Sequence, residues 1–402
     1  MNPTFKSLLF RQVSIGKSLR IELVHIIWFT LALVALMVEM ARGREAIDNY
    51  LIFRGVFYHV LGQKNLFVYY PEEYVSFNNY GPAFSLVIAP FAVLPIYLGC
   101  FLWGIANATS LFGAIRMLPV KKEHTTLLYW IICIEMMTSL HNMQFNPMLT
   151  AFFIFAFVYT RNGKDWLATL FIAIGILTKI YGVAALVFFL FSKNKWQFII
   201  SLFLWLVLLV LLPMSFSSVD YIFNTYQDWY YQIIKRNQQN IQASLVGGMQ
   251  DISVPGMIRR IFHYYQFPDL VLIAVAGILV AVPLLKYRLL SETSFQLRYL
   301  ALALIGIVIF SSAAESPTFV IAVTGCAIWV VLQKQPFKLS VSGLIVFLFL
   351  LTILSPTDLI PPYIRQHFIL AYSLKALPCF LIWCCLVYEV WQTKSSSNLQ
   401  PV

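Results

Sequence analysis

Charged residues are scarce in this 402-residue chain. Asp, Glu, Lys and Arg make up 11% of it, whereas hydrophobic residues make up 60%. In soluble domains about a quarter of the residues are charged and about half are apolar. The mean hydropathy of +0.77 is therefore that of an integral membrane protein. Apolar runs able to cross a bilayer of about 30 Å recur from Ile21 to Trp391, which leaves no room for a large soluble domain.

The motifs of several soluble enzyme classes are missing. The sequence has no Walker-type glycine loop, no G-x-G-x-x-G after a strand, no H-E-x-x-H and no G-x-S-x-G. The six histidines stand singly, and the six cysteines lie in apolar stretches without disulfide or zinc spacing. We therefore expect neither a metal nor a cofactor, and a sugar donor would be carried on a lipid instead of a nucleotide.

The net charge of +11 does not indicate nucleic-acid binding, because no stripe of Lys and Arg follows any one segment. In a membrane protein such charge orients the spans and contacts anionic headgroups. A basic segment precedes the first span and lacks a small-residue cleavage site, so we interpret that span as a retained signal anchor.

The apolar runs predict an all-α polytopic protein. We expect a cytoplasmic N-terminus over residues 1–20, one transmembrane catalytic domain over 21–391 and a cytoplasmic tail over 392–402. About twelve spans are predicted, at residues 21–40, 83–97, 98–117, 124–140, 147–160, 166–191, 196–213, 268–285, 297–313, 317–333, 339–355 and 369–391.

This set of spans conflicts with the positive-inside rule at one place. It puts Lys193 and Lys195 inside, as the rule requires, but puts Lys121 and Lys122 outside. The span 166–191 is also long and is interrupted by Lys179, which indicates a broken or re-entrant helix.

Two segments are too long and too polar to be turns. They are residues 41–82 and 214–267, and the span count places both on the outer side. Both are rich in tyrosine, and the second also contains Trp229. Aromatic amphipathic stretches of this kind favour helices that lie in the membrane interface.

The first of these loops contains the clearest candidate for chemistry, Asp48, about eight residues beyond the first span. A carboxylate held at the membrane boundary, where water is scarce, can keep a useful proton affinity. It would suit the general base that takes a proton from an acceptor hydroxyl attacking a sugar. The alternative is a carboxylate that is only solvated.

Polar residues inside apolar runs are a second group of candidates. A buried ammonium such as that of Lys179 is normally paired or functional. It would bind a phosphate or pyrophosphate near the membrane surface, or it would pair with Glu135, or it would be an ordinary lysine at a helix break. Gln144 and Asn146 would bind a sugar hydroxyl or cap a helix end.

The later half offers further candidates. Glu315 precedes Ser-Pro, where it would punctuate a turn or face substrate as a second catalytic carboxylate. Guanidinium groups suit bidentate phosphate contacts. We therefore expect the arginines of the second loop to clamp a lipid phosphate or to contact headgroups; they are Arg236, Arg259 and Arg260.

An ordered series of motifs resembles glycosyltransferase family 87. The series runs from Asp48 with Tyr50 through Tyr69-Tyr70-Pro71, Tyr80-Gly81-Pro82, Trp103, Asn107, Asn142-x-Gln144-x-Asn146, Lys179-Ile-Tyr181 and Lys195-Trp196. It covers residues 20–200 well and the remainder only in general layout. In place of a histidine-containing Ser-Pro motif found in many members, this chain has Glu315-Ser316-Pro317.

The resemblance implies a GT-C fold and an inverting hexosyltransferase that uses a polyprenyl-phosphate sugar, such as mannose or arabinofuranose. It implies that Asp48 is the base, that Glu315 substitutes for the missing histidine, and that Tyr80 and Tyr181 lie among the substrate-binding residues. The acceptor would be lipid-linked or a glycan, at the outer face of a bacterial inner membrane. A transporter or flippase of lipid-linked glycans and a polysaccharide polymerase or ligase are the alternatives.

Overall fold

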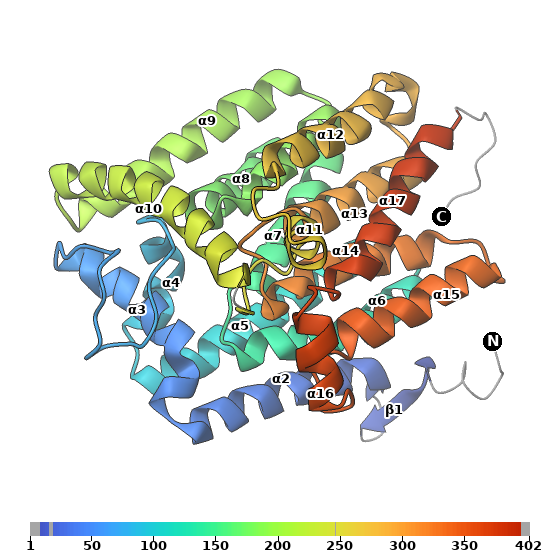
Figure 1. Cartoon of the computed structure of the whole chain (residues 1–402). Coiled ribbons are helices and arrows are strands. Elements are labelled where there is room, and N and C mark those ends of the chain that lie inside the picture. The colour runs from blue at the N-terminus through green and yellow to red at the C-terminus, as the bar shows by residue number, and fades with distance from the viewer. Residues whose placement is uncertain (1–8, 16–18, 246, 395–402) are drawn as a thin grey trace. The chain divides into compact units, whose positions relative to one another are not determined.

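The computed structural model describes residues 9–15, 19–245 and 247–394, and these are mainly helical (Figure 1). The chain folds into two compact units. Unit 1 contains Met1–Leu31, Ile115–Thr138 and Asn240–Val402, and unit 2 contains Ala32–Ala114 and Ser139–Gln239. Four helices contribute residues to both units: α2, α5, α6 and α10.

Unit 2 is built mainly from the first half of the chain. Its elements, in order, are α2 (Leu23–Arg42), the 3-10 helix η1 (Arg44–Ile47), α3 (Asp48–Leu61), α4 (Phe84–Ala92), α5 (Ile96–Arg116), α7 (Asn146–Arg161), α8 (Asp165–Lys179), the 3-10 helix η2 (Tyr181–Phe191), α9 (Lys195–Leu211), η3 (Leu212–Ser215) and α10 (Val219–Leu245).

Unit 1 holds both strands and the remaining helices. Its elements are β1 (Gln12–Ile15), β2 (Leu19–Glu22), α6 (Lys122–His141), α11 (Val254–Phe262), α12 (Asp269–Ala281), η4 (Val282–Leu285), η5 (Tyr287–Leu289), α13 (Thr293–Ile309), η6 (Ser316–Thr318), α14 (Phe319–Leu332), α15 (Leu339–Leu348), the π-helix η7 (Phe349–Ile353), α16 (Pro362–Ile364), the π-helix η8 (Arg365–Leu370) and α17 (Ala376–Gln392).

The core of unit 1 is a group of helices that are apolar on all sides. Helices α13, α14 and α17 run side by side (Figure 1). The α13–α14 contact is close because Gly325 faces α13, where an added Cβ would lie 2.8 Å from the carbonyl oxygen of Ala301. Helices that are apolar around their whole circumference are those of a buried core or a membrane span.

The structure has helices suited to crossing a membrane. In the described part of the chain, three are long and apolar enough to do so by length and composition: Leu23–Arg42, Ile96–Arg116 and Lys195–Ser215. Shorter apolar helices cover most of the other predicted spans, among them Thr293–Ile309, Ser316–Leu332 and Ala376–Gln392.

The predicted span 83–97 is wrong. The helix there, α4, has 9 residues and contains Pro90, and the chain turns before α5 begins at Ile96. At 1.5 Å per residue, a helix of this length is about 14 Å long, roughly half the thickness of a hydrocarbon core.

The contacts of Lys122 also differ from the prediction. Its Nζ lies 3.1 Å from Oε1 of Glu22, at the start of α2, and the hydroxyl of Thr126 donates to Oε2 of Glu22 at 2.7 Å. The first turn of α6 therefore lies beside the residues that precede α2. This contact is inconsistent with the predicted placement of Lys121 and Lys122 on the side opposite the N-terminus.

The predicted break at Lys179 is present. Helix α8 ends at Lys179, Ile180 has a left-handed backbone with φ of 58°, and the chain continues as the 3-10 helix η2. η2 folds back on α8, where a Cβ added to Gly175 would lie 3.0 Å from Cα of Gly182. The predicted single span 166–191 is therefore a helical hairpin.

The prediction of an all-α chain misses one element. Strands β1 and β2 pair antiparallel, with Gln12 opposite Glu22. Both strands alternate polar and apolar residues, as Gln-Val-Ser-Ile and Leu-Arg-Ile-Glu, and this period of two was the available signal. Much of the predicted N-terminal segment 1–20 and most of the predicted tail 392–402 lie outside the described residues.

The hairpin of α8 and η2 generates a stability prediction. A Cβ at Gly182 would lie 2.7 Å from the carbonyl oxygen of Ile172 and would also collide with the backbone of Gly175 and Ile176. We expect Gly182→Ala to lower the unfolding midpoint in detergent, by an overpacking cost of about 1–3 kcal/mol. The matched control is Gly113→Ala, because a Cβ at Gly113 meets nothing within 4 Å. Equal midpoints for the two variants would contradict the close packing of this hairpin.

Candidate active site

Asp48 is the first residue of α3, directly after the turn that follows α2. It is half-buried, and its Oδ1 accepts a hydrogen bond of 2.6 Å from the backbone N–H of Val75. A carboxylate is favoured in the first turn of a helix, where unpaired N–H groups give a partial positive charge. Asp48 thus joins the start of α3 to the segment that follows this helix.

That segment is pinned to α3 by a second group of contacts. His59, on α3, lies 2.8 Å from Oε2 of Glu73, and Lys64 lies 3.7 Å from Oε1 of the same carboxylate. Burial lowers the pKa of His59, and the negative charge of Glu73 opposes that shift. The ring of Tyr74 lies over Gly55, whose missing side chain makes room for it.

The turn between α6 and α7 connects Asp48's helix to Lys179. Met143 has a left-handed backbone with a φ of 49°. The carbonyl oxygens of Asn142 and Met143 each accept a hydrogen bond from another helix. Asn49 donates to the carbonyl oxygen of Asn142 at 2.9 Å, and Trp103 donates to that of Met143 at 3.1 Å. At the other end of the turn, Lys179 Nζ donates to Oδ1 of Asn146 at 2.7 Å.

Tyr181 and the Tyr80-Gly81-Pro82 motif complete this end of unit 2. The ammonium of Lys179 lies 5.2 Å from the ring centre of Tyr181, which is a cation–π contact. A Cβ at Gly81 would lie 2.8 Å from the carbonyl oxygen of Leu177, so this motif packs directly on the last turn of α8. The Gly here allows the two backbones to approach.

Two of the predicted substrate-binding side chains are largely buried. Tyr80 is 8% exposed, and its ring packs against Phe53 and Phe84 in an aromatic cluster that also contains Trp103 and Phe145. Gln144 is 9% exposed. The ring of Tyr80 therefore stabilises the fold of this end of the unit.

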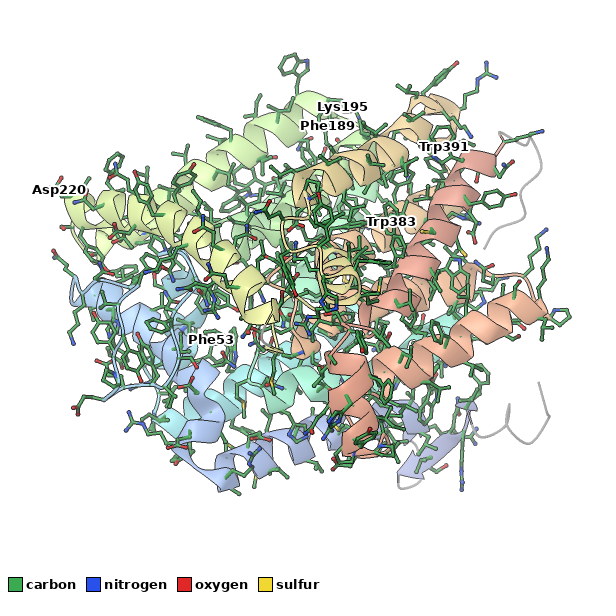
Figure 2. The ribbon with its side chains drawn as sticks, viewed as in Figure 1. Phe53, Phe189, Lys195, Asp220, Trp383 and Trp391 are labelled. Carbon is green, nitrogen blue, oxygen red and sulfur yellow. The ribbon has the colours of Figure 1, made fainter. Side chains whose placement is uncertain are left out.

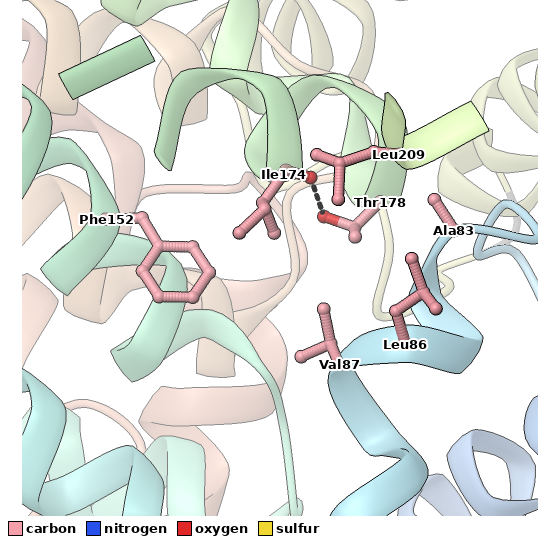
Figure 3. A pocket seen from close by; sticks show the side chains of 7 residues that line it. All are labelled: Ala83, Leu86, Val87, Phe152, Ile174, Thr178 and Leu209. Carbon is pink, nitrogen blue, oxygen red and sulfur yellow. Dashed lines mark hydrogen bonds between the residues drawn. The ribbon is translucent and has the colours of Figure 1, made fainter. Parts of the chain in front are cut away.

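A cavity of about 250 Å³ is lined in part by Thr178, the residue before Lys179 (Figure 3). Its walls come from α4, α7, α8 and α9 and are almost entirely apolar; the lining residues are Ala83, Leu86, Val87, Phe152, Ile174, Thr178 and Leu209. Thr178 immediately precedes Lys179, and its hydroxyl donates to the carbonyl oxygen of Ile174, so it presents no free donor to the cavity. An apolar space thus lies next to the residue that carries the ammonium.

One polar pair near the turn was missed by the sequence analysis. Glu39, 4% exposed in the last part of α2, lies 2.8 Å from Nδ1 of His141 and accepts a 2.8 Å hydrogen bond from Arg42. His141 directly precedes Asn142. Glu39 lies in an apolar run, and a carboxylate in such a run is a sequence signal that could have identified this pair.

The structure does not support phosphate binding by Arg259 and Arg260. Arg259 is fully buried, with Asp251 Oδ2 at 2.7 Å and Asp269 Oδ1 at 2.6 Å. Arg260 is 7% exposed and donates to the carbonyl oxygens of Gly248, Gln250 and Leu370. Most of their donors are engaged in these contacts, which hold the segment before α12 in its fold, whereas the buried Nε of Arg260 has no hydrogen-bond partner.

Arg236 differs from these two arginines. It is half-exposed on α10, and its phosphate-binding role remains a prediction.

The N-terminal part of α10 packs on the first long loop of unit 2, where Tyr221 donates to the carbonyl oxygen of Lys64 at 2.6 Å and Trp229 to that of Asn79 at 3.1 Å. Both long loops therefore meet at the end of unit 2 that holds Asp48.

Glu315, in unit 1, punctuates a turn. It caps the 3-10 helix η6: its side chain accepts from the backbone of Thr318, whose hydroxyl accepts from the N–H of Glu315 at 3.3 Å. The next residue, Ser316, accepts a 2.9 Å hydrogen bond from Lys375. A catalytic role for Glu315 remains a prediction, and the structure supplies a local structural role in addition.

Glu135 does not have the predicted partner. It is fully buried and lies 2.8 Å from Nζ of Lys375, which is 2% exposed at its side chain. Lys179 instead bonds the neutral amide of Asn146. The residues that the structure describes contain no group of three or more His, Cys, Asp or Glu that could hold a metal ion.

Comparison with known proteins decides the family. The sequence model of glycosyltransferase family 87 matches residues 77–317, more than half of the chain. The chain belongs to glycosyltransferase family 87. It is therefore a glycosyltransferase, as the sequence predicts, and its apolar helices are those of a multi-pass membrane protein.

Comparisons with curated proteins and with solved structures do not add to the family assignment. No curated protein matches the chain. A solved structure, ArnT from Cupriavidus metallidurans bound to undecaprenyl phosphate, aligns with 91% of this chain and 77% of that chain, at 13% identity and a TM-score of 0.37. Similarity at that level supports no conclusion about this family 87 glycosyltransferase.

The two lysine contacts predict different costs of substitution. Lys375→Met leaves Glu135 buried without its cation, so we expect a destabilisation of about 3–5 kcal/mol. Adding Glu135→Leu should recover most of this loss, because replacing both partners removes the uncompensated charge. Lys179→Met serves as the comparison and should cost less, since the hydrogen bond that it removes is to a neutral amide. Thermal unfolding in detergent measures all three, and an equal cost for the two single variants would contradict this assignment.

Proposed function

We propose that this glycosyltransferase moves a sugar from a polyprenyl-phosphate donor to a lipid-linked or glycan acceptor at the outer face of the cytoplasmic membrane. The observation that supports this best is the arrangement at one end of unit 2. There Lys179 directly follows Thr178, which lines an apolar cavity of about 250 Å³, and Lys179 is connected to Asp48's helix by the turn Asn142–Asn146.

The cavity and the ammonium fit the two halves of such a donor. An isoprenoid chain is apolar and flexible, and it would place its first units among Leu86, Val87 and Phe152. Its phosphate would then lie at the mouth, within reach of Lys179. A lysine at this position stabilises the negative charge that grows on the phosphate when the sugar leaves.

Asp48 would act as the general base. The hydroxyl of the acceptor gives its proton to the Asp48 carboxylate while its oxygen forms a bond to the anomeric carbon. The bond between that carbon and the phosphate oxygen breaks, and the polyprenyl phosphate leaves with the electron pair. A single displacement of this kind inverts the anomeric configuration. The hydrogen bond from Val75 holds one carboxylate oxygen and leaves the other to accept the proton.

The corrected helices also support an outer site. With α4 not crossing, and α8 and η2 crossing in opposite directions, the basic connections all fall on the N-terminal side. They contain Lys121 and Lys122, Arg161 and Lys164, Lys193 and Lys195, Lys286 and Arg288, and Lys334 and Lys338. These connections follow the positive-inside rule, although the proposed outer loop 41–82 also contains Arg44, Arg54 and Lys64. Lys195 is the first residue of α9, and Asp220 lies in the first turn of α10, beyond the proposed outer end of α9 (Figure 2).

Replacing the proposed base tests the mechanism. Asp48→Asn keeps an oxygen to accept the hydrogen bond of Val75 but cannot take a proton. We therefore expect turnover to fall by about 10²–10⁴-fold. The measurement is transfer of radiolabelled sugar from polyprenyl-phosphate mannose or arabinose in membranes that contain the native acceptors.

A neighbouring carboxylate gives the matched control for that substitution. Glu45 is exposed in the preceding 3-10 helix, so Glu45→Gln removes the same charge nearby without touching Asp48. It should leave turnover within a factor of about two, as expected of a surface substitution. Near-normal turnover in Asp48→Asn, at normal protein levels, would remove Asp48 from the mechanism.

Sidedness is tested by cysteine labelling. In a background without native cysteines, Ser76→Cys and Gln239→Cys should react with an impermeant thiol reagent added to intact spheroplasts. Lys121→Cys should react only after the membrane is broken, because α4 does not cross. All three positions are exposed side chains, so access is decided by the membrane. Reaction of the Lys121 variant in intact spheroplasts would overturn this topology.

A further inference from the structure

The aromatic rings of residues 65–79, the segment that bonds Asp48 through Val75, fall into a packed set and an exposed set. Tyr70 packs on His59, at 4.2 Å between ring centres, and Tyr74 is buried against Gly55. Tyr69 and Phe77 point away from the protein. They are 49% and 46% exposed, and their ring centres lie 5.2 Å apart. We call these two exposed rings the Tyr69–Phe77 platform.

The platform is held rigidly although its rings are exposed. On one side, Tyr70 donates to the carbonyl oxygen of Asn65 at 2.8 Å, and Glu73 is fixed by His59. On the other side, Asn78 is buried and bonds the backbone of Tyr80. Rings fixed in advance lose little conformational freedom when they bind a ligand.

The platform lies next to the proposed base. Val75, whose N–H bonds Asp48 at 2.6 Å, is two residues from Phe77 in the sequence. The backbone that carries Phe77 is therefore anchored to the carboxylate of Asp48 two residues earlier.

The charges of the segment indicate which ligand the rings suit. Residues 65–79 include Glu72 and Glu73 and no Lys or Arg. An acidic segment is repelled by anionic headgroups, whereas membrane-binding segments of this kind are usually basic. Exposed rings beside hydrogen-bonding side chains suit an uncharged sugar chain, because its C–H faces pack on rings while its hydroxyls bond Glu72 and the exposed Ser76.

We propose that the Tyr69–Phe77 platform binds the acceptor and that the acceptor is an uncharged glycan chain, with its last sugar over Phe77 and its reacting hydroxyl directed to Asp48. This inference rests on the proposed function, since it assigns the acceptor of that reaction.

Binding of soluble sugars tests the platform without the reaction. The probes are mannopentaose and arabinopentaose, and binding to the purified protein in lipid nanodiscs is measured by saturation-transfer NMR. We expect one of them to bind. Tyr69→Ala and Phe77→Ala should each weaken that binding about tenfold, the effect of losing one stacking ring. The control is Tyr97→Ala, which removes an equally exposed ring from the start of α5.

Absence of binding by both probes, or equal binding by the two platform variants and the wild type, would overturn the proposal. So would immersion of the segment in lipid. A spin label on Ser76→Cys should be relaxed by a water-soluble nickel complex; stronger relaxation by oxygen, which concentrates in the bilayer, would assign the rings to the membrane.

The two hypotheses fail in different ways. If Asp48→Asn abolishes transfer while the platform variants transfer and bind normally, the glycosyltransferase mechanism stands and the platform is wrong. If Asp48→Asn transfers normally while the platform variants lose sugar binding, the base is misassigned and the acceptor site stands.

Discussion

The candidate site depends on the short turn between α6 and α7. Its carbonyls accept hydrogen bonds from Asn49 and Trp103, and its last residue, Asn146, accepts one from Lys179. These donors come from three helices, so the turn fixes the start of α3, the start of α5 and the end of α8 relative to one another. The left-handed backbone of Met143 makes this possible, because it turns the two carbonyls toward different partners.

Much of this end of unit 2 is predictable from the sequence. Apolar runs mark the helices, and a lysine inside one of them marks the break after α8, because a buried ammonium next to unpaired backbone groups is costly in lipid. The sequence also selects Asp48 and Lys179 for their chemistry. It does not show that the turn Asn142–Asn146 connects their helices, since such connections form between residues about a hundred positions apart.

The error in the predicted span 83–97 also accounts for the predicted side of Lys121 and Lys122. Residues 83–97 are apolar enough to cross a membrane, and hydropathy does not reveal that Pro90 and the turn before Ile96 divide them. Counting one extra span there reverses the side of Lys121 and Lys122. Treating 166–191 as one span instead of two reverses the side again, so the two span counts place the second long loop on the same side.

A basic side chain can pair with nearby carboxylates, or it can stay available to an incoming anion. The sequence does not distinguish these two cases. Arg259 lies between two aspartates that are 8 and 10 residues away in the sequence, so its charge is consumed locally. Lys179 bonds the neutral amide of Asn146 and lies over the ring of Tyr181, and neither of these groups carries a negative charge. A cation bonded to a neutral group keeps its attraction for an incoming anion, whereas a cation in a buried ion pair must first lose its partner, at a cost of several kcal/mol. Of the basic residues that the sequence selects, this leaves Lys179 better suited than Arg259 or Arg260 to meet a phosphate.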